Sequence, residues 1–180
     1  MRWIVFAVFA AASFSAVAGT IDINLSNDTI EAKYDSAAGA ADWTFGALYN
    51  RDEKNYAFNV GLLAAGDTSA GGSRIEGGVG GKIYTVRVAE SDVAALALGG
   101  QVRWFPNNGS FAIGGYAFYA PKVVTFMDGQ NFYDTGIRGE VEVIKNSSVY
   151  IGYRWTRAEL DNGTSPYVDK GGFAGLQVKF

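Results

Sequence analysis

The sequence predicts an all-β protein, an antiparallel transmembrane up-and-down β-barrel of eight to ten strands. Three observations support this fold class. Glycine occurs 24 times and aromatic residues make up 14% of the chain, whereas proline occurs three times, a composition typical of many strands joined by turns. Apolar residues alternate with polar or small ones over segments of about ten residues or more, the length of a tilted membrane strand. Aromatic residues lie near many segment ends, where membrane barrels form girdles.

Residues 1–18 have the pattern of a signal peptide. Arg2 precedes an apolar run, and the small residues Ala16 and Ala18 have the spacing that a signal peptidase requires. The alternative is a membrane anchor, but the uninterrupted apolar run is shorter than the roughly 20 residues that a spanning helix needs. We therefore expect export, removal of residues 1–18, and one β-barrel domain formed by residues 19–180.

The first alternating pieces of that domain are 21–25 and 29–34, which flank an Asn27-Asp28 turn. They could form a short hairpin that joins the barrel. The alternative is a segment outside the sheet, because the first piece is short. Eight strands without this hairpin, or ten with it, both place the two ends of the barrel on the same side of the membrane.

From residue 42 onward, turn-forming residues separate eight alternating segments. We expect strands near 42–50, 56–65, 74–88, 92–105, 110–120, 131–144, 148–159 and 171–180. The alternation is clearest in DVAALALGGQVRW, FYDTGIRGEVEVI and VYIGYRWT and in the C-terminal GGFAGLQVKF. FAIGGYAFYA is apolar in both registers, so its inward face stays open. The glycine-rich GGVGG lies within an alternating segment, which favours close packing in a curved sheet over a phosphate-binding loop.

The direction of the apolar face separates two interpretations. In a soluble sandwich the apolar face points inward and the charges lie in water. Export, strand length and strand-end aromatics favour the inverse, in which apolar residues face lipid and charges face a lumen. The strand-end aromatics are Trp43, Tyr49, Tyr56, Trp104, Phe105, Phe111, Tyr119, Phe132, Tyr133, Tyr150, Trp155 and Phe180.

Connection lengths give an independent indication, because bacterial barrels have short turns on the periplasmic side and longer loops outside. With the C-terminus in the periplasm, the long connections 121–131 and 160–170 fall outside, where they could bind a partner at the cell surface. Two connections depart from this rule. The inner connection 66–73 is long, and the outer connection 89–91 is short.

The expected lumen face carries charges of both signs. Its members are Glu76, Lys82, Arg103, Asp134, Arg138, Glu140, Glu142, Arg154 and Lys179. An eight-stranded barrel is just wide enough for side chains to fill it, so we expect these charges to pair and close the lumen. Ten strands would leave more room, enough for a narrow water-filled path.

Several stretches resemble the YfaZ family of outer-membrane proteins. They are GGKIYTV, ALALGGQVRW, GGYAFYAPKVVTFMDG, RGEVEVI, VYIGYRW and GLQVKF, and the resemblance extends from about residue 21 to residue 180. YAPKVVTF followed by YIGYRW is its most distinctive part. The family implies an outer-membrane β-barrel of Gram-negative bacteria, with outer-membrane lipid as its surroundings. It implies no biochemical activity for particular residues.

The C-terminal strand resembles the signal by which the barrel assembly machinery recognises unfolded outer-membrane proteins. The alternating residues of this expected assembly signal are Gly172, Ala174, Leu176, Val178 and Phe180. A defined last strand has a physical role, because an unpaired edge in lipid leaves backbone groups unsatisfied. The assembly machinery is therefore the expected partner during biogenesis.

Composition excludes several kinds of chemistry. With 15 basic and 18 acidic residues and no basic run, nucleic acid is not an expected partner. The chain has no cysteine and no histidine, so it has neither disulfides nor a histidine base. Glu140 and Glu142 share a strand face, but pairing with arginines is the favoured interpretation over a glycosidase pair. We expect no metal site and no cofactor.

Three classes of function follow. The first is a non-enzymatic barrel with a structural or surface-binding role and a side-chain-filled lumen. The second is a narrow channel for small solutes, and the third is a hydrolase that works without histidine. No residue pattern identifies a surface ligand.

Overall fold

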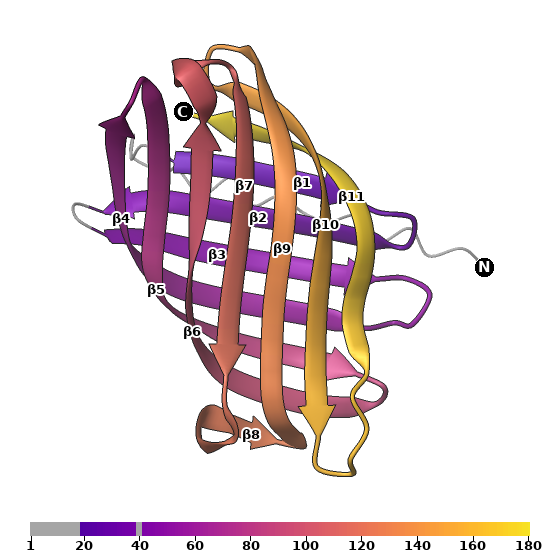
Figure 1. The fold of residues 1–180 in the computed structure, drawn as a ribbon. Helices are drawn as coiled ribbons and strands as arrows, with labels where there is room; N and C mark the ends of the chain where they lie inside the picture. Colours follow the sequence, from indigo (N-terminus) through magenta and orange to yellow (C-terminus); the bar gives the residue numbers. More distant parts are fainter. Residues whose placement is uncertain (1–18, 39–40) are drawn as a thin grey trace.

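Residues 19–38 and 41–180 are described by a computed structural model, in which ten long antiparallel strands surround a lumen (Figure 1). The expected signal peptide, 1–18, lies outside the described residues. The long strands are β1 (Gly19–Leu25), β2 (Thr29–Ala38), β3 (Ala41–Asn50), β4 (Tyr56–Ala70), β5 (Ser73–Val88), β6 (Ser91–Phe105), β7 (Phe111–Ala120), β9 (Gly129–Ile144), β10 (Ser147–Leu160) and β11 (Tyr167–Lys179). None of the described helices is long and apolar enough to cross a membrane.

Each long strand pairs with the next, and the sheet closes on itself. β5 pairs with β6, and the circle is completed where β1 pairs with β11. Gly19 and Phe180 exchange two backbone hydrogen bonds of 2.9 Å at this junction. The expected antiparallel barrel is confirmed, and the strand count is ten because the hairpin near 21–34 belongs to the sheet.

The connection from β7 to β9 contains three short elements. The first is the 3-10 turn η2 (Lys122–Val124), and the second is the strand β8 (Thr125–Met127), which pairs with β6. The third is a turn that leads into β9. A second 3-10 turn, η1 (Pro106–Asn108), joins β6 to β7. These elements leave the barrel order unchanged, since β7 pairs directly with β9.

The expectation of a long inner connection at 66–73 is wrong. β4 and β5 continue to pair until Ala70 lies opposite Ser73, and only Gly71 and Gly72 form the turn. Both glycines have positive φ, +58° and +77°, which suits a tight hairpin turn. Because β3 pairs with β4 only as far as Leu63, this hairpin extends past β3 at the end that holds the C-terminus (Figure 1), whereas β6 pairs with β5 as far as Arg74.

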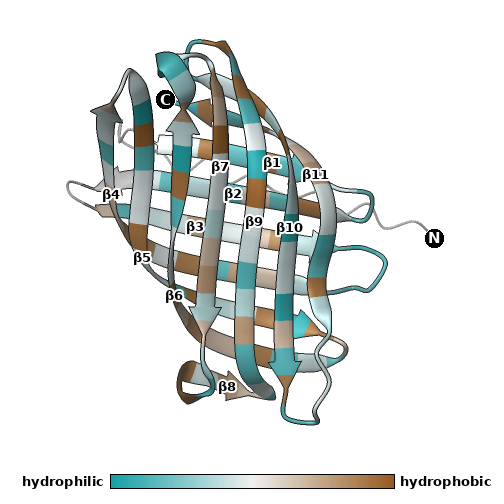
Figure 2. Ribbon diagram, viewed as in Figure 1, coloured by the Kyte–Doolittle hydropathy of each residue, from teal (hydrophilic) through white to brown (hydrophobic). Residues whose placement is uncertain are grey.

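The outer surface is apolar and the charges point inward. Ile151 is 72% exposed and Val79 is 67% exposed, whereas Arg154 and Glu140 are each 1% exposed. Hydrophilic and hydrophobic segments alternate along the strands in Figure 2. This is the inverse of a soluble sandwich, in which the apolar face would be buried. The lipid-facing interpretation of the alternation is therefore correct.

Three aromatic residues assigned to the outer girdles lie inside the barrel instead. Phe105, Phe132 and Tyr150 are each buried, at 3% exposure or less. They lie near strand ends, but on the inward-facing set of alternating positions. A position near a strand end therefore does not by itself predict a ring that faces lipid. The ring points outward only if the residue belongs to the outward-facing set of alternating positions.

Glycines let neighbouring strands bend sharply around the lumen. A Cβ atom on Gly80 of β5 would lie 2.0 Å from the carbonyl oxygen of Leu62, and one on Gly99 of β6 would lie equally close to that of Ala117. Such contacts exclude any side chain. The GGVGG segment thus permits close strand packing, as expected from its place within a strand.

Candidate functional site

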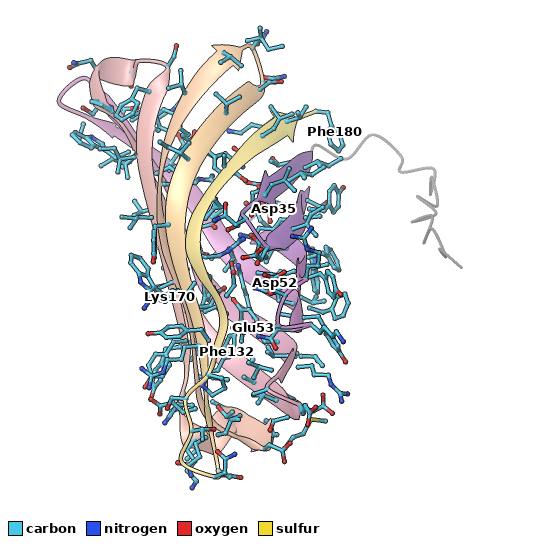
Figure 3. The ribbon with its side chains drawn as sticks, turned by 90° about the vertical axis from the view of Figure 1, so that its right-hand side faces the viewer. Asp35, Asp52, Glu53, Phe132, Lys170 and Phe180 are labelled. Atoms are coloured by element: carbon cyan, nitrogen blue, oxygen red, sulfur yellow. The ribbon has the colours of Figure 1, made fainter. Side chains whose placement is uncertain are left out.

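The lumen has two regions of different chemistry. The end of the barrel that carries the turn after β5, the β7–β9 connection and the β10–β11 loop is called the loop end here. The opposite end, with Gly19 and Phe180, is the terminal end. In Figure 3 the labelled Asp35 lies nearer the terminal end and Phe132 nearer the loop end.

Buried apolar side chains fill the lumen at the loop end. This cluster, the apolar plug, comprises Leu48, Ala57, Leu63, Tyr84, Val86, Val88, Val93, Ala95, Ala97, Phe118, Ala120, Phe132, Ala158, Leu160 and Val168. The rings of Tyr84 and Phe132 pack with centroids 4.6 Å apart. The Tyr84 hydroxyl then donates a 2.7 Å hydrogen bond to Asp134, which marks the start of the polar region.

The first charged cluster is centred on Arg154 of β10. Its guanidinium forms ion pairs with Glu31 of β2 and Asp169 of β11. Glu31 also accepts a 2.8 Å hydrogen bond from Asn24 and lies 3.1 Å from the Lys33 ammonium. Since Arg154 is 1% exposed, it depends on these carboxylates in place of water.

The second charged cluster is centred on Glu140 of β9. Arg103 and Arg138 approach its two oxygens at 2.9 and 3.1 Å. Arg138 also lies 3.0 Å from Asp22, which accepts a hydrogen bond from the Tyr150 hydroxyl. The cluster thus alternates in charge across the lumen, an arrangement that offsets the cost of burial.

This cluster continues toward the terminal end through Glu76. The carboxylate of Glu76 lies 3.3 Å from both Arg74 and Arg103 and 3.9 Å from Lys179. Gln177 of β11 accepts a 3.3 Å hydrogen bond from Arg103. The two clusters together tie β1, β2, β5, β6, β9, β10 and β11 to one another across the lumen.

The structure brings together most of the lumen charges expected from sequence, but in two groups. Glu76, Arg103, Arg138, Glu140 and Lys179 belong to the second cluster. Arg154 belongs to the first, so the neighbouring Arg138 and Arg154 use different carboxylates.

Three of the expected lumen charges lie outside both clusters. Asp134 accepts hydrogen bonds from Tyr84 and Thr156, at 2.7 and 2.9 Å. Glu142 is exposed at the terminal end, where it accepts a 3.3 Å hydrogen bond from the Asn146 backbone. Lys82 is buried and has no carboxylate within ion-pair distance among the described residues.

Several members of the clusters were not among the lumen charges expected from sequence. Asp22, Asn24, Glu31 and Lys33 lie on β1 and β2, where they alternate with apolar residues. That alternation was the available signal, and including the hairpin in the barrel would have revealed them. Asp169 carried no such signal, because it lies in a segment expected to be a loop.

A cavity of about 420 Å³ lies in the lumen between the charged clusters and the terminal end. Asp35, Asp42 and Asp67 contribute acidic groups to its wall, and Lys82 and Tyr116 also line it. No group of three or more acidic residues in the described part of the chain has the arrangement of a metal site.

The expected assembly-signal residues Gly172, Ala174, Leu176, Val178 and Phe180 share the outward face of β11. Leu176 and Phe180 are 48% and 56% exposed. The Phe180 ring stacks on that of Tyr34, with centroids 6.4 Å apart and planes inclined by 20°. β11 pairs with both β10 and β1, so the last strand closes the barrel.

Replacing Phe180 by aspartate should strongly reduce the amount of protein assembled in the membrane. A carboxylate near the membrane surface costs only about 0–1 kcal/mol in a barrel, so lost stability would not explain a large decrease. Heat-modifiable migration on gels of membrane fractions measures the assembled amount. Lys179→Gln changes the adjacent inward residue and should have little effect. Equal assembly of the two variants would show that Phe180 is not part of the recognised signal.

A closed antiparallel barrel that is apolar outside and charged inside is a β-barrel of the outer-membrane type. The chain belongs to a known family of such proteins, described as YfaZ precursor, whose sequence pattern matches residues 3–180. This confirms the resemblance found in the sequence. No curated protein sequence matches the chain significantly.

Similarity to solved structures is low in sequence. The outer-membrane protease OmpT from Escherichia coli is 13% identical with a TM-score of 0.42, over 91% of this chain and 93% of OmpT. The outer-membrane channel DcaP of Acinetobacter baumannii is 10% identical with a TM-score of 0.40, over 88% of this chain and 54% of DcaP. OccK11 (OpdR) of Pseudomonas aeruginosa is 6% identical with a TM-score of 0.30, over 94% of this chain and 68% of OccK11. None of these similarities bears on the activity of this chain.

Proposed function

We propose that this protein is a small, non-enzymatic outer-membrane barrel with a structural or surface-interaction role and a lumen closed by its own side chains. In this proposal residues 1–18 are removed on export, the terminal end faces the periplasm, and the loop end faces the cell exterior. The observation that carries the proposal is the apolar plug, which fills the lumen at the loop end.

The plug opposes conduction for a physical reason. An ion that enters an apolar constriction loses its hydration and gains no polar partner, which costs far more than thermal energy. Phe118 and Phe132 are at most 1% exposed, so their rings leave no surface accessible to water. Below the plug, the charged clusters bind their own counter-charges rather than a passing ion.

The β7–β9 connection supports the surface-interaction part of the proposal. Val123, Phe126 and Met127 are 84%, 58% and 65% exposed at the loop end. Met127 also has a positive φ of +64°, a conformation that non-glycine residues rarely adopt. Exposed apolar side chains grouped on a short connection are typical of contact surfaces.

A narrow channel is the second candidate, and the cavity at the terminal end favours it because this end of the lumen is open to water. Bilayer conductance separates the two. Wild-type protein in planar bilayers should show no steady conductance if the plug closes the lumen. Large, steady and ion-selective currents would overturn the closed-barrel proposal. A hydrolase is disfavoured, because the sequence contains no histidine to activate a nucleophile.

The membrane assignment has its own test. We expect the protein to fractionate with outer membranes and to migrate differently on gels before and after heating, because a closed barrel resists detergent until it is heated. A fully assembled periplasmic protein would instead be recovered in the soluble fraction. Such recovery, with no change in migration, would contradict the proposed location.

A further inference from the structure

We propose that the lumen cavity binds a small zwitterion, with the carboxylate of the ligand beside Lys82 and its ammonium group toward Asp35 and Asp42. This inference goes beyond the proposed closed-barrel role, because a cavity that ends at the plug can bind a solute without conducting it. The ligand class follows from the charges that the protein itself leaves unpaired.

Lys82 is a buried charge without a counter-charge in ion-pair distance in the described part of the chain. Its side chain lines the cavity and is 7% exposed, and its ammonium lies 4.2 Å from the centroid of the Phe118 ring at the edge of the plug. The ring offers a cation–π contact but no hydrogen-bond acceptor. Among the described residues, no carboxylate lies within ion-pair distance of Lys82.

The other basic residues of the cavity wall differ from Lys82 in this respect. Arg103 and Arg138 contact Glu140, Lys33 contacts Glu31, and Lys179 lies near Glu76. A buried ammonium without a counter-charge is costly, so an anion that enters the cavity gains most at Lys82.

Two hydroxyl-bearing residues, Thr44 and Tyr116, also line the cavity. Thr44 is 3% exposed, and its methyl group and the Lys82 stem both lie against Gly61, at 2.8 and 2.5 Å from the position of a Cβ there. Tyr116 precedes Phe118 by two residues on the inward face of β7 and also lines the cavity. Neither hydroxyl has a hydrogen-bond partner in the described part of the chain. The Thr44 hydroxyl can donate to a carboxylate held by Lys82, whereas the Tyr116 hydroxyl lies over Gly136 of β9.

Acidic groups lie on the other side of this donor set. Asp35 and Asp42 line the cavity, and neither has a cation within ion-pair distance among residues 19–38 and 41–180. They would repel a simple anion and attract an ammonium group. The unpaired charges of the cavity are therefore positive at Lys82 and negative at these carboxylates, which complements a molecule that carries both.

The strand register sets the separation between the backbones that carry the two charges. Asp35, Thr44, Gly61 and Lys82 are successive cross-strand neighbours on β2, β3, β4 and β5. Because adjacent strands lie about 4.8 Å apart, the backbones of Asp35 and Lys82 are separated by about 14 Å along the wall. The missing side chain at Gly61 makes room for the Lys82 stem and the Thr44 methyl group, and the cavity volume of about 420 Å³ is in the range of small-molecule sites.

Calorimetric titration of the full mature protein in detergent micelles tests the proposal with three probes of equal chain length. 4-Aminobutyrate carries both charges. Butyrate carries only the negative charge, and butylamine carries only the positive charge. We expect saturable binding of 4-aminobutyrate and at least about tenfold weaker binding of each single-charge probe, the loss expected for one charge-assisted contact. Equal binding of butyrate, equal binding of butylamine, or no binding of 4-aminobutyrate would each overturn the inference.

Variants locate the site. Lys82→Met should weaken binding of 4-aminobutyrate by at least about tenfold, and Asp35→Asn should weaken it while leaving butyrate binding equal or stronger. Lys122→Met removes an exposed lysine of η2 and should change nothing. Heat-modifiable migration verifies that each variant is folded. If Lys82→Met does not fold, Asp35→Asn tests the site instead, because it should bind 4-aminobutyrate more weakly but butyrate equally or more strongly. Unchanged binding in folded Lys82→Met would contradict the assignment, whatever the conductance of the barrel.

Discussion

Replacing Arg154 by methionine should lower the free energy of unfolding by about 3–5 kcal/mol, the cost of breaking a buried ion pair from one side. The guanidinium is 1% exposed and is paired with Glu31 and Asp169. After the substitution Glu31 retains Lys33, but among residues 19–38 and 41–180 Asp169 retains only the Thr29 hydroxyl, at 2.8 Å. The loss therefore comes chiefly from an orphaned buried carboxylate. Denaturant unfolding in lipid vesicles, followed by tryptophan fluorescence, measures it.

The same strand provides a matched control. Arg157 of β10 has a side chain that is 39% exposed and lies 3.7 Å from Glu159, so Arg157→Met should cost no more than about 1 kcal/mol. Adding Asp169→Asn to Arg154→Met should restore part of the lost stability, because it removes the unpaired charge. If Arg154→Met and Arg157→Met destabilise the barrel equally, the first charged cluster does not stabilise the fold in the way described.

Removing the two phenylalanine rings of the apolar plug should convert a silent barrel into a conducting one. Phe118 and Phe132 are 1% and 0% exposed and belong to the same buried cluster. Phe118→Ala with Phe132→Ala opens space within the apolar plug, and Tyr84 and Asp134 would then border a path for water. Each substitution also costs about 3–5 kcal/mol for a phenylalanine replaced by alanine in a packed core. Single-channel recordings measure the opening.

Equivalent substitutions on the lipid face control for the chemical change. Phe45 and Phe58 are 44% and 54% exposed on the outer surface, so Phe45→Ala with Phe58→Ala should leave the barrel closed. Gel migration before and after heating verifies that both double variants are folded. If the plug variant is folded but does not conduct, the charged clusters rather than the apolar plug close the lumen.

Alternation by itself was sufficient to predict the barrel and the direction of most side chains. Ile151 and Arg154 are three residues apart on β10, and their opposite exposures, 72% and 1%, follow from the two-residue period of a strand. The same period failed where apolar residues occupy both faces, as in FAIGGYAFYA. There the inward set could be identified only from the packing of Phe118 and Ala120 in the plug.

What the sequence determined by itself was therefore the membrane β-barrel, most of its strands and a lumen rich in charge, because these properties repeat locally along each strand. Only the tertiary structure decided which charges meet. Arg154 pairs with Glu31, 123 residues earlier in the chain, because closure pairs β1 with β11, and β2 follows on the other side of β1. Such pairs depend on the strand number and the register of the whole sheet. The same closure gathers the apolar inward residues of β3 to β7 and β9 to β11 into one plug, and at its edge Lys82 has no carboxylate within ion-pair distance among the described residues.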